Sequence, residues 1–382
     1  MYLERKIQQI IENRFFKGKV IVIYGARQTG KTTLVKKILE KYQNKHPSLY
    51  LNCEILSVQQ SLKITEPKRL KDYFGKAKLI VLDEAQKIEN IGLVLKLLVD
   101  TFPQIQIVAT GSSSFDLGNK VNEPLTGRVD KFILYPFSLE EIKKEKNAFE
   151  IDASIERILR FGLYPEVFFL SEKEAIFRLD EITSNYLFKD VLNFEGIKKS
   201  KIIVGLLQLL ALQIGSTVSY NEIATQLGVN RLTIQKYLDI LENAFVIFTL
   251  RSFSRNLRTE IAKSVKIYFW DLGIRNSLIQ NYNLPSLRGD IGALWENFCL
   301  VERLKYHQNN QKKANYYFWR TYDQKEIDLV EEKNGRFNLF EFKWQEKKIK
   351  KPKLFLSTYP QSQFLGVSRN NYWELLKEVE QK

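Results

Sequence analysis

The chain has few of the residues that mark secreted or membrane proteins. Only two of its 382 residues are cysteines, Cys53 and Cys299, and each lies in an apolar stretch. We therefore expect both to be reduced core residues of a cytoplasmic protein, without a disulfide. The first residues, MYLERKIQQIIENRF, predict a charged amphipathic helix and lack the apolar centre of a signal peptide. No run of the sequence approaches the roughly 18 apolar residues that span a bilayer.

Acidic residues are also in the minority. The 59 lysines and arginines exceed the 44 aspartates and glutamates, so the net charge is +15. This excess favours a polyanionic partner, most simply nucleic acid, although an anionic membrane surface would attract the same charge. Hydrophobic residues make up 44% of the chain, which is typical of folded domains. The length is sufficient for two or three domains with cores of their own.

The strongest motif is a glycine-rich loop between a strand pattern and a helix pattern. The β-branched run 20–24 predicts a buried parallel strand, and it leads directly into Gly25-x-x-x-x-Gly30-Lys31-Thr32. In such a loop the backbone N–H groups surround phosphate oxygens, the lysine reaches the β- and γ-phosphates, and the hydroxyl binds Mg²⁺. The motif therefore predicts an ATP and Mg²⁺ site formed by Gly25, Ala26, Arg27, Gln28, Thr29, Gly30, Lys31, Thr32 and Thr33.

A second strand pattern ends in two acids. The segment KLIVLDEAQKI predicts a buried strand that ends at Asp83 and Glu84. Asp83 fits a carboxylate that helps to hold Mg²⁺, and Glu84 fits the residue that polarises the attacking water. Glu84 and Lys31 are therefore candidate catalytic residues for ATP hydrolysis.

Two further strand patterns, 48–53 and 104–114, extend the predicted parallel sheet. Because the carboxyl ends of such strands face the ligand, Thr110 and Ser112 are candidates to sense the γ-phosphate, with a capping or turn role as the alternative. Arg128 follows a glycine-containing turn and precedes another strand pattern. It is a candidate catalytic arginine finger that would act on the ATP of a neighbouring subunit in a homo-oligomer. The alternative is a surface arginine that pairs with an acid.

The centre of the chain predicts helices, with a lid or connector over 138–200. The following segment, TVSYNEIATQLGVNRLTIQKYLDILENAFVIFTL, predicts a winged helix-turn-helix. A capping box starts its first helix at Ser219, Gly228 ends that helix, and Asn230 caps the second. A strand and wing follow in FVIFTLRSFSRN. We expect the second helix to bury Leu232, Ile234, Tyr237, Leu238 and Leu241.

The exposed start of this second helix has two interpretations. If the helix enters a major groove, the residues that would face DNA are Arg231, Thr233, Gln235 and Lys236. Alternatively, the winged helix contacts another protein or another part of this one.

The C-terminal part contains the best short hairpin signal of the chain, Asn334-Gly335. A two-residue turn there would place Asp328 opposite Glu341, and Glu326 opposite Lys343. One face would then hold these four charges together with Val330, Leu339 and Phe337, and the other would hold Ile327, Leu329, Phe340, Phe342 and Trp344.

Two acids this close, with a lysine beside them, match a Mg²⁺ site that activates water. Glu296, on the predicted helix GALWENFCLVERLK, could supply a third oxygen. The candidate second Mg²⁺ site thus comprises Glu296, Asp328, Glu341 and Lys343. The alternative is a solvated face in a fold that has lost nuclease activity.

The chain resembles the prokaryotic AAA+ ATPases of the archaeal type, whose C-terminal half is a domain of unknown function with a restriction-endonuclease-like fold. The resemblance implies ATP binding and hydrolysis, and it also implies the acid…acid-x-lysine arrangement of such nucleases. The segments that carry it are GARQTGKTTL, LDEAQKI, ATGSSSFDL, LTGRVDKFILYPFSLEE, FGLYPEV, KIYFWDLGIRNSL, GALWENFCLVERLK, EIDLV and EFKW.

We therefore expect an α/β protein whose P-loop AAA+ parallel sheet precedes the other domains. The expected boundaries are 1–137 for the ATPase core, 138–200 for the lid or connector, 201–255 for the winged helix and 256–382 for the restriction-endonuclease-like domain. The expected function is an ATPase that couples turnover to remodelling of nucleic acid or a partner protein. Two alternatives stay open: an ATP-gated, metal-dependent endonuclease, and a binding switch with slow hydrolysis.

Overall fold

The chain forms two compact units in the computed structural model. One comprises Met1–Phe137 with Asn243–Phe245, and the other comprises Ser138–Glu242 with Val246–Lys382. The expected wing lies partly in 255–264, outside the described residues, as do the last two residues of the strand pattern 104–114. The structure describes residues 2–63, 66–112, 125–187, 200–254, 265–321, 323, 325–345 and 349–379.

The first unit contains the predicted parallel sheet. Its five strands lie in the order β2-β3-β4-β1-β5, and every neighbouring pair is parallel. Because β4 lies between β1 and β3, the ends of these three strands meet at one edge of the sheet. The strands are β1 (Val20–Tyr24), β2 (Ser48–Asn52), β3 (Leu79–Asp83), β4 (Gln106–Gly111) and β5 (Val129–Ile133).

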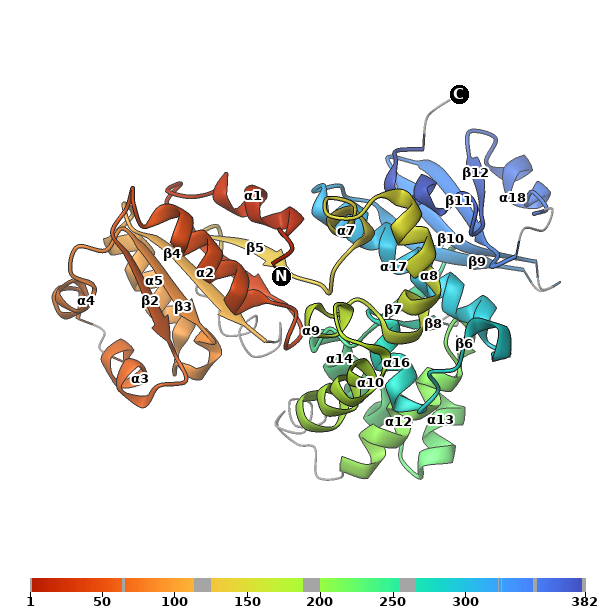
Figure 1. Ribbon diagram of the computed structural model, residues 1–382, viewed down its shortest axis with the longest axis horizontal. Coiled ribbons are helices and arrows are strands. Elements are labelled where there is room, and N and C mark those ends of the chain that lie inside the picture. Colours follow the sequence, from red (N-terminus) through yellow and green to blue (C-terminus); the bar gives the residue numbers. More distant parts are fainter. Residues whose placement is uncertain are drawn as a thin grey trace. The chain divides into compact units, whose positions relative to one another are not determined.

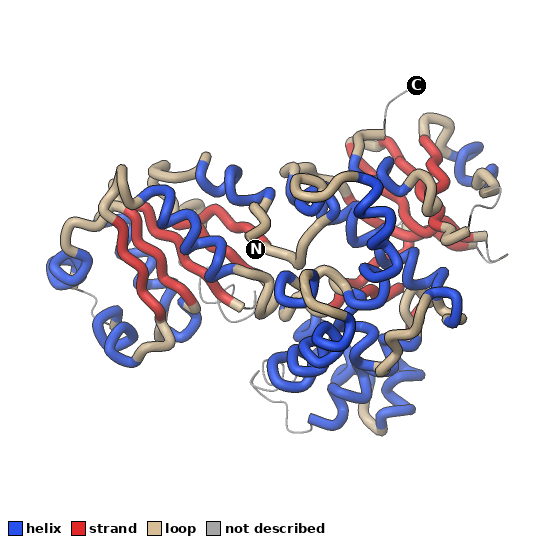
Figure 2. Tube along the Cα trace, in the orientation of Figure 1, coloured by secondary structure: helices blue, strands red, loops and turns tan. Residues whose placement is uncertain are grey.

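Helices cover both faces of this sheet, as a parallel sheet requires (Figure 2). Ile11 of α1 and Leu34 of α2 pack in one apolar cluster with Ile21 and Ile23 of β1. Val22, which points to the opposite face, is equally buried. The helices of the first unit are α1 (Lys6–Glu12), α2 (Lys31–Tyr42), α3 (Leu56–Leu62), α4 (Pro67–Phe74), η1 (Ala85–Lys87) and α5 (Ile91–Thr101).

The second unit begins with helices and continues with a mixed sheet (Figure 1). Its helical elements are α7 (Leu139–Ile142), α8 (Ala148–Phe161), α9 (Pro165–Phe168), α10 (Glu172–Glu181), the π-helical η3 (Ile182–Leu187), α12 (Ser200–Leu212), α13 (Tyr220–Leu227), α14 (Arg231–Asn243), α16 (Leu272–Leu278), η4 (Pro285–Leu287), α17 (Ile291–Asn309), α18 (Lys353–Thr358) and η5 (Tyr372–Leu376). Its strands are β6 (Thr217–Val218), β7 (Ile247–Ser252), β8 (Val265–Phe269), β9 (Asn315–Arg320), β10 (Glu326–Lys333), β11 (Arg336–Phe342) and β12 (Gln363–Val367).

One seven-stranded sheet runs through the second unit in the order β12-β11-β10-β9-β7-β8-β6. Parallel pairing of β7 with β9 joins the segment 201–255 to the segment 256–382. The sequence patterns did not indicate this pairing, because a strand pattern does not name its partner. Within the described ranges, no helix combines the length and apolar character needed to cross a membrane.

The helix ends in the segment 217–243 follow the predicted signals, although the structure gives Ser219 only one of the two bonds of a capping box. Ser219 Oγ accepts a hydrogen bond from Glu222 N, and Asn230 Oδ1 accepts one from Thr233 N at 2.8 Å. Gly228 ends α13 in the left-handed conformation. The prediction for Leu232 is wrong: its side chain is 73% exposed, because it lies in the first turn of α14, beyond the buried stripe that starts at Ile234.

The predicted Asn334-Gly335 hairpin is confirmed. Both turn residues have positive φ, and β10 pairs with β11 from Lys333↔Arg336 to Leu329↔Phe340, which is the expected register.

Helix α17 carries charged residues into the core of the second unit. The guanidinium of Arg303 donates to both carboxylate oxygens of Glu331, at 2.5 and 2.9 Å, and both side chains are buried. His307, near the end of α17, shares a hydrogen bond of 2.7 Å with the hydroxyl of Tyr316. Burial lowers the pKa of His307 to about 4.

This buried histidine predicts an acid-sensitive step in stability. The folded chain resists protonation of His307, so its contribution to stability is intact above pH ~6.5 and is lost as the pH falls toward 4. The full loss corresponds to ~3 kcal/mol. We expect the free energy of unfolding in urea to depend less on pH in His307→Gln than in wild type across this range. His46→Gln, at the other histidine of the chain, is the control and should keep the wild-type profile. Parallel pH profiles for wild type and His307→Gln would contradict the assignment.

Candidate functional site

The glycine-rich loop connects β1 to α2 at the carboxyl edge of the first sheet. Gly25 has a φ of +152°, and a Cβ there would lie 2.3 Å from the carbonyl oxygen of Leu134. Only glycine fits so close to that backbone. The ammonium of Lys31 donates to the carbonyl oxygens of Gly25 and Ala26, both at 2.8 Å. The loop therefore already encloses the lysine that was predicted to reach phosphate.

Asp83, at the end of β3, lies beside this loop and is 3% exposed. Its Oδ2 accepts hydrogen bonds from the hydroxyls of Thr32, at 2.8 Å, and Tyr50, at 2.6 Å. Its Oδ1 accepts one from Thr110. Burial and the hydrogen bond to Asp83 raise the pKa of Tyr50. Three elements, α2, β2 and β4, thus fix the position of one carboxylate.

Glu84 follows in the left-handed conformation, with a φ of +55°. Its backbone N–H donates to the hydroxyl of Thr110 at 3.1 Å. Gln86 Nε2 donates to Glu84 Oε2 at 2.5 Å and to Ser112 Oγ at 3.2 Å. Thr110 and Ser112 therefore contact the two acids and their neighbour, and in this arrangement they orient these side chains.

The groups around Asp83 fit a magnesium ion that accompanies a nucleotide. The Thr32 hydroxyl and the Asp83 carboxylate lie within hydrogen-bond distance of each other, and both are oxygen donors of the kind that Mg²⁺ prefers. Most of the remaining ligands in such sites are water and phosphate oxygens, so two protein oxygens are sufficient.

Arg128 lies at the amino ends of the parallel strands, opposite the end that carries the glycine-rich loop. It immediately precedes β5, which runs parallel to β1, whereas the glycine-rich loop follows β1. Its Nε donates to Asp100 Oδ1 at 2.6 Å, and both side chains are exposed. Arg128 is therefore remote from the loop of its own chain.

The predicted acidic cluster of the second unit forms only in part as expected. Lys343 Nζ lies 2.7 Å from Glu341 Oε1 and 3.9 Å from Asp328 Oδ2. Glu326, however, does not pair with Lys343. Its carboxylate contacts Lys266 of β8 and lies 3.6 Å from Arg320 Nε.

A β-bulge explains the difference. Ile327 pairs with Trp319 but Val330 pairs with Tyr317, so two residues of β10 oppose one of β9. Past this bulge Ile327 lies in an apolar cluster with Val330 and two residues of β11. The prediction that Ile327 and Val330 lie on opposite faces of the sheet is therefore wrong. That cluster consists of Ile327, Val330, Phe337, Leu339 and Phe355.

Lys266 occupies the centre of the cluster on the other face. Its ammonium is 3.0 Å from Glu296 Oε1, contacts Glu326, and belongs to a side chain that is 2% exposed. Tyr268 OH donates to the same oxygen of Glu296 at 2.6 Å. Burial alone would lower the pKa of Lys266, but Glu296, Asp328 and Glu326 raise it above its usual value.

The candidate second Mg²⁺ site stays a prediction, and Lys266 competes with such an ion for Glu296. Across the described ranges, no group of three or more histidine, cysteine, aspartate or glutamate side chains is placed to hold a metal ion. The physical reason is that Lys266 supplies the positive charge that a metal would bring, and it engages Glu296 from inside the fold.

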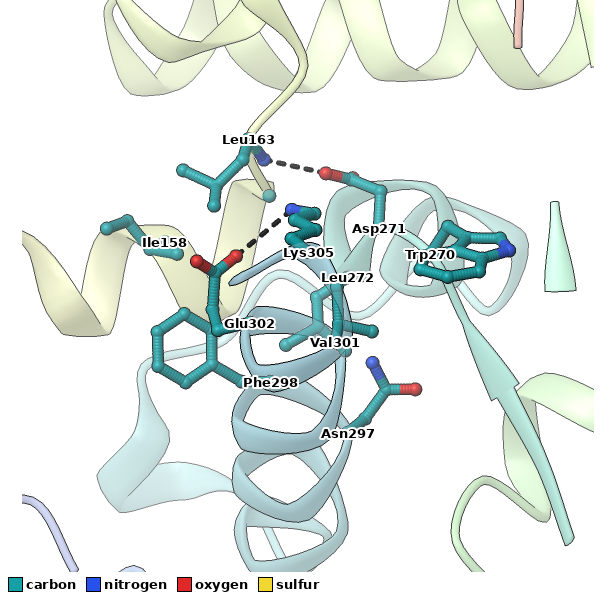
Figure 3. A pocket seen from close by; sticks show the side chains of 11 residues that line it. Ile158, Leu163, Trp270, Asp271, Leu272, Asn297, Phe298, Val301, Glu302 and Lys305 are labelled. Carbon is teal, nitrogen blue, oxygen red and sulfur yellow. Dashed lines mark hydrogen bonds and ion pairs between the residues drawn. The ribbon is translucent and has the colours of Figure 1, made fainter. Parts of the chain in front are cut away.

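A small cavity lies where α8, α16 and α17 meet (Figure 3). The buried carboxylate of Asp271 faces the backbone N–H of Leu163, which donates to it at 2.7 Å, and Lys305 faces Glu302 at 3.0 Å. The volume is about 20 Å³, enough for one water molecule and too small for a substrate. The cavity therefore belongs to the packing of the second unit.

Sequence reasoning missed three of these residues. Tyr50 and Gln86 are ordinary polar residues in their segments, and only the folded sheet brings them to Asp83 and Glu84. Lys266 had a usable signal: it interrupts the apolar strand VKIYF, where a lysine is buried only if acids surround it.

Three domain families match the chain. An AAA domain matches residues 17–143, and two domains of unknown function, DUF8612 and DUF4143, match residues 152–284 and 291–372. The first match supports a nucleotide-dependent activity of the AAA type. The restriction-endonuclease-like character expected for the last part does not appear among these matches.

Relatives extend over most of the chain. An uncharacterized protein of Mycobacterium tuberculosis is 28% identical over 331 residues, 86% of this chain and 70% of that protein. Another, of Haemophilus influenzae, is 27% identical over 333 residues, 79% of this chain and 78% of that protein. A third, of Methanocaldococcus jannaschii, is 27% identical over 332 residues, 78% of this chain and 73% of that protein.

Solved structures are only distantly similar. The Pif1 helicase of Candida albicans has 15% identity and a TM-score of 0.27, with 48% of each chain covered. A Drosophila ORC structure with AT-rich DNA and Cdc6 has 12% identity and a TM-score of 0.26, covering 72% of this chain and 89% of that one. At such TM-scores neither likeness carries an argument about this chain.

The buried lysine predicts how the second unit responds to divalent ions. Without nucleotide, millimolar MgCl₂ should leave the melting temperature of the wild-type chain unchanged, because Lys266 already balances Glu296 and Glu326. Lys266→Met should destabilise the fold by about 3–5 kcal/mol, since it removes a counter-charge from the buried Asp328 and from the partly buried Glu296 and Glu326. MgCl₂ should then recover part of that loss.

Differential scanning fluorimetry measures both effects, with Lys325→Met, at an exposed lysine, as the matched control. If Lys266→Met does not fold, the MgCl₂ titration of the wild-type chain is sufficient to test the prediction. A rise of several degrees in the melting temperature of wild type on adding MgCl₂ would contradict this prediction and support the second Mg²⁺ site.

Proposed function

We propose that this protein is an ATP-hydrolysing AAA-type enzyme that couples nucleotide turnover to remodelling of nucleic acid or a partner protein. One observation carries the proposal: Lys31, Thr32, Asp83 and Glu84 converge at the carboxyl edge of the five-stranded parallel sheet, where β4 brings Thr110 between them. A structural sheet edge has no need for a buried carboxylate that accepts three hydroxyl groups.

Each residue then has a role in the reaction. The loop N–H groups and Lys31 would bind the phosphates, and Thr32 and Asp83 would hold a Mg²⁺ ion, which would supply positive charge against the phosphates. Glu84 would accept a proton from the attacking water, while Gln86 donates a hydrogen bond to its Oε2. Thr110 keeps the backbone of Glu84 aligned with Asp83.

Arg128 fits this proposal only as a residue that acts on a neighbouring subunit. It lies at the edge of the sheet opposite its own phosphate loop, so the proposal includes a homo-oligomer in which the exposed Arg128 exchanges Asp100 for the γ-phosphate of another protomer.

We assign the output of ATP turnover to the second unit. The elements α12, β6, α13, α14, β7 and β8 follow one another in the order of a winged helix, and the start of α14 exposes Arg231 and Lys236. This part would contact nucleic acid or protein, with 138–200 as the connector. For residues 256–382 we retain a restriction-endonuclease-like fold without its chemistry.

The two alternative functions, an endonuclease and a binding switch, agree with the arrangement of these residues to different degrees. An ATP-gated endonuclease would need a divalent ion at Asp328 and Glu341, and Lys266 competes with that ion for the third candidate ligand, Glu296. A binding switch with slow hydrolysis uses the same residues, and the rate of turnover separates it from a remodelling enzyme.

The proposed hydrolysis is tested with two substitutions in the site. Lys31→Ala should abolish nucleotide binding, and Glu84→Gln should keep binding while lowering kcat by at least ~100-fold, because the base is lost and the fold is not. Phosphate release and binding of fluorescent ADP measure the two effects. Glu89→Gln, at an exposed glutamate paired with Lys63, is the matched control. Wild-type turnover in Glu84→Gln would remove Glu84 from its role.

The nature of the partner is tested with salt. If α14 binds DNA, affinity should fall steeply as salt rises, and Arg231→Ala or Lys236→Ala should each reduce the log–log slope by ~0.9 for every phosphate that the variant no longer neutralises. Lys173→Ala, an exposed lysine of α10, should leave the slope unchanged. Fluorescence anisotropy with labelled duplexes gives these slopes. Absence of binding even at low salt would assign the winged helix to protein contacts.

A further inference from the structure

We propose that Arg5 is a positioning residue of the phosphate loop, which binds neither phosphate nor metal itself but fixes the loop that does. The inference rests on the proposed nucleotide site. Arg5 precedes α1 and is only 4% exposed. One guanidinium nitrogen donates to the carbonyl oxygen of Thr29 at 2.7 Å, and the other donates to that of Tyr135 at 2.5 Å.

The bond to Thr29 sets the direction of a loop N–H. The carbonyl of Thr29 and the N–H of Gly30 belong to one planar, trans peptide group, so they point in opposite directions. Holding the carbonyl on Arg5 therefore turns the Gly30 N–H away from Arg5. Gly30 immediately precedes α2, whose first N–H groups are the natural partners of a phosphate.

The bond to Tyr135 fixes the other wall of the same loop. Leu134, the preceding residue, donates its N–H to Tyr24 O, and its carbonyl oxygen is the atom that excludes a side chain at Gly25. The guanidinium also lies over the ring of Phe137, 5.1 Å from its centroid. Arg5 thus ties the end of the phosphate loop to the segment that follows β5.

A planar fork suits this task better than a single ammonium, because it can donate to two carbonyl groups at once. Packing alone does not explain the charge. Ile7 and Ile11 already hold α1 against the sheet, and an apolar residue at position 5 would cost less to bury. The guanidinium is therefore explained by the two carbonyl groups that it holds.

The test measures nucleotide affinity and turnover in the full chain. We expect Arg5→Lys and Arg5→Ala to raise the Kd for fluorescent ADP and the KM for ATP by tenfold or more, with kcat changed less than threefold. Millimolar guanidinium should restore part of the affinity in Arg5→Ala and none in Lys31→Ala. Arg14→Ala, at an exposed arginine of the same segment, should match wild type.

Three outcomes overturn the proposal. Unchanged Kd in Arg5→Ala removes Arg5 alone and leaves the proposed function standing. Loss of affinity that guanidinium does not restore, in a variant that melts at a lower temperature, reduces Arg5 to a fold-stabilising residue. Absence of nucleotide binding in wild type removes both proposals together. If Arg5→Ala does not fold, the Kd of Arg5→Lys tests the proposal, since this variant keeps the positive charge and lacks the planar guanidinium that donates to two carbonyl groups.

Discussion

The first unit depends on the carboxylate of Asp83. Hydroxyl groups from α2, β2 and β4 all donate to it, so the helix after the phosphate loop and two separate strands share one buried acceptor. A parallel sheet aligns strand ends only approximately, through its ladder of backbone bonds. The shared carboxylate fixes the positions of the side chains at that edge. The position of Glu84 is fixed as well, because it is the next residue and donates its N–H to Thr110.

The two units treat buried negative charge in different ways. Around Asp83 the groups that donate to the carboxylate are hydroxyls of Thr32, Tyr50 and Thr110, which are neutral donors that a cation could replace. Around Glu296 the neighbours include the ammonium of Lys266, which satisfies that charge permanently. Under the proposed function, the same residue types would therefore hold an exchangeable ion in one unit, while they pair with a lysine of the sheet in the other.

Much of this could be predicted from local sequence. The glycine-rich loop, the strand that ends at Asp83 and the Asn334-Gly335 turn depend on the conformations of neighbouring residues, which the sequence specifies directly. The contact of Tyr50 with Asp83 and that of Lys266 with Glu296 join distant elements, and no local pattern encodes them. The bulge in β10 was missed for a related reason: it is a property of the pairing with β9, which the turn at 334–335 does not control.

That bulge links two parts of the second unit that otherwise have nothing in common. Its extra residue sends Ile327 toward the apolar cluster on one face of the sheet, while Glu326 and Asp328 stay with Lys266 on the other. Strict alternation through the same residues would exchange the two environments, with Glu326 and Asp328 among aromatic rings and Ile327 among charges. The apolar cluster and the charged cluster therefore both depend on one irregular pairing between β10 and β9, and neither would form from the sequence of β10 in a regular strand.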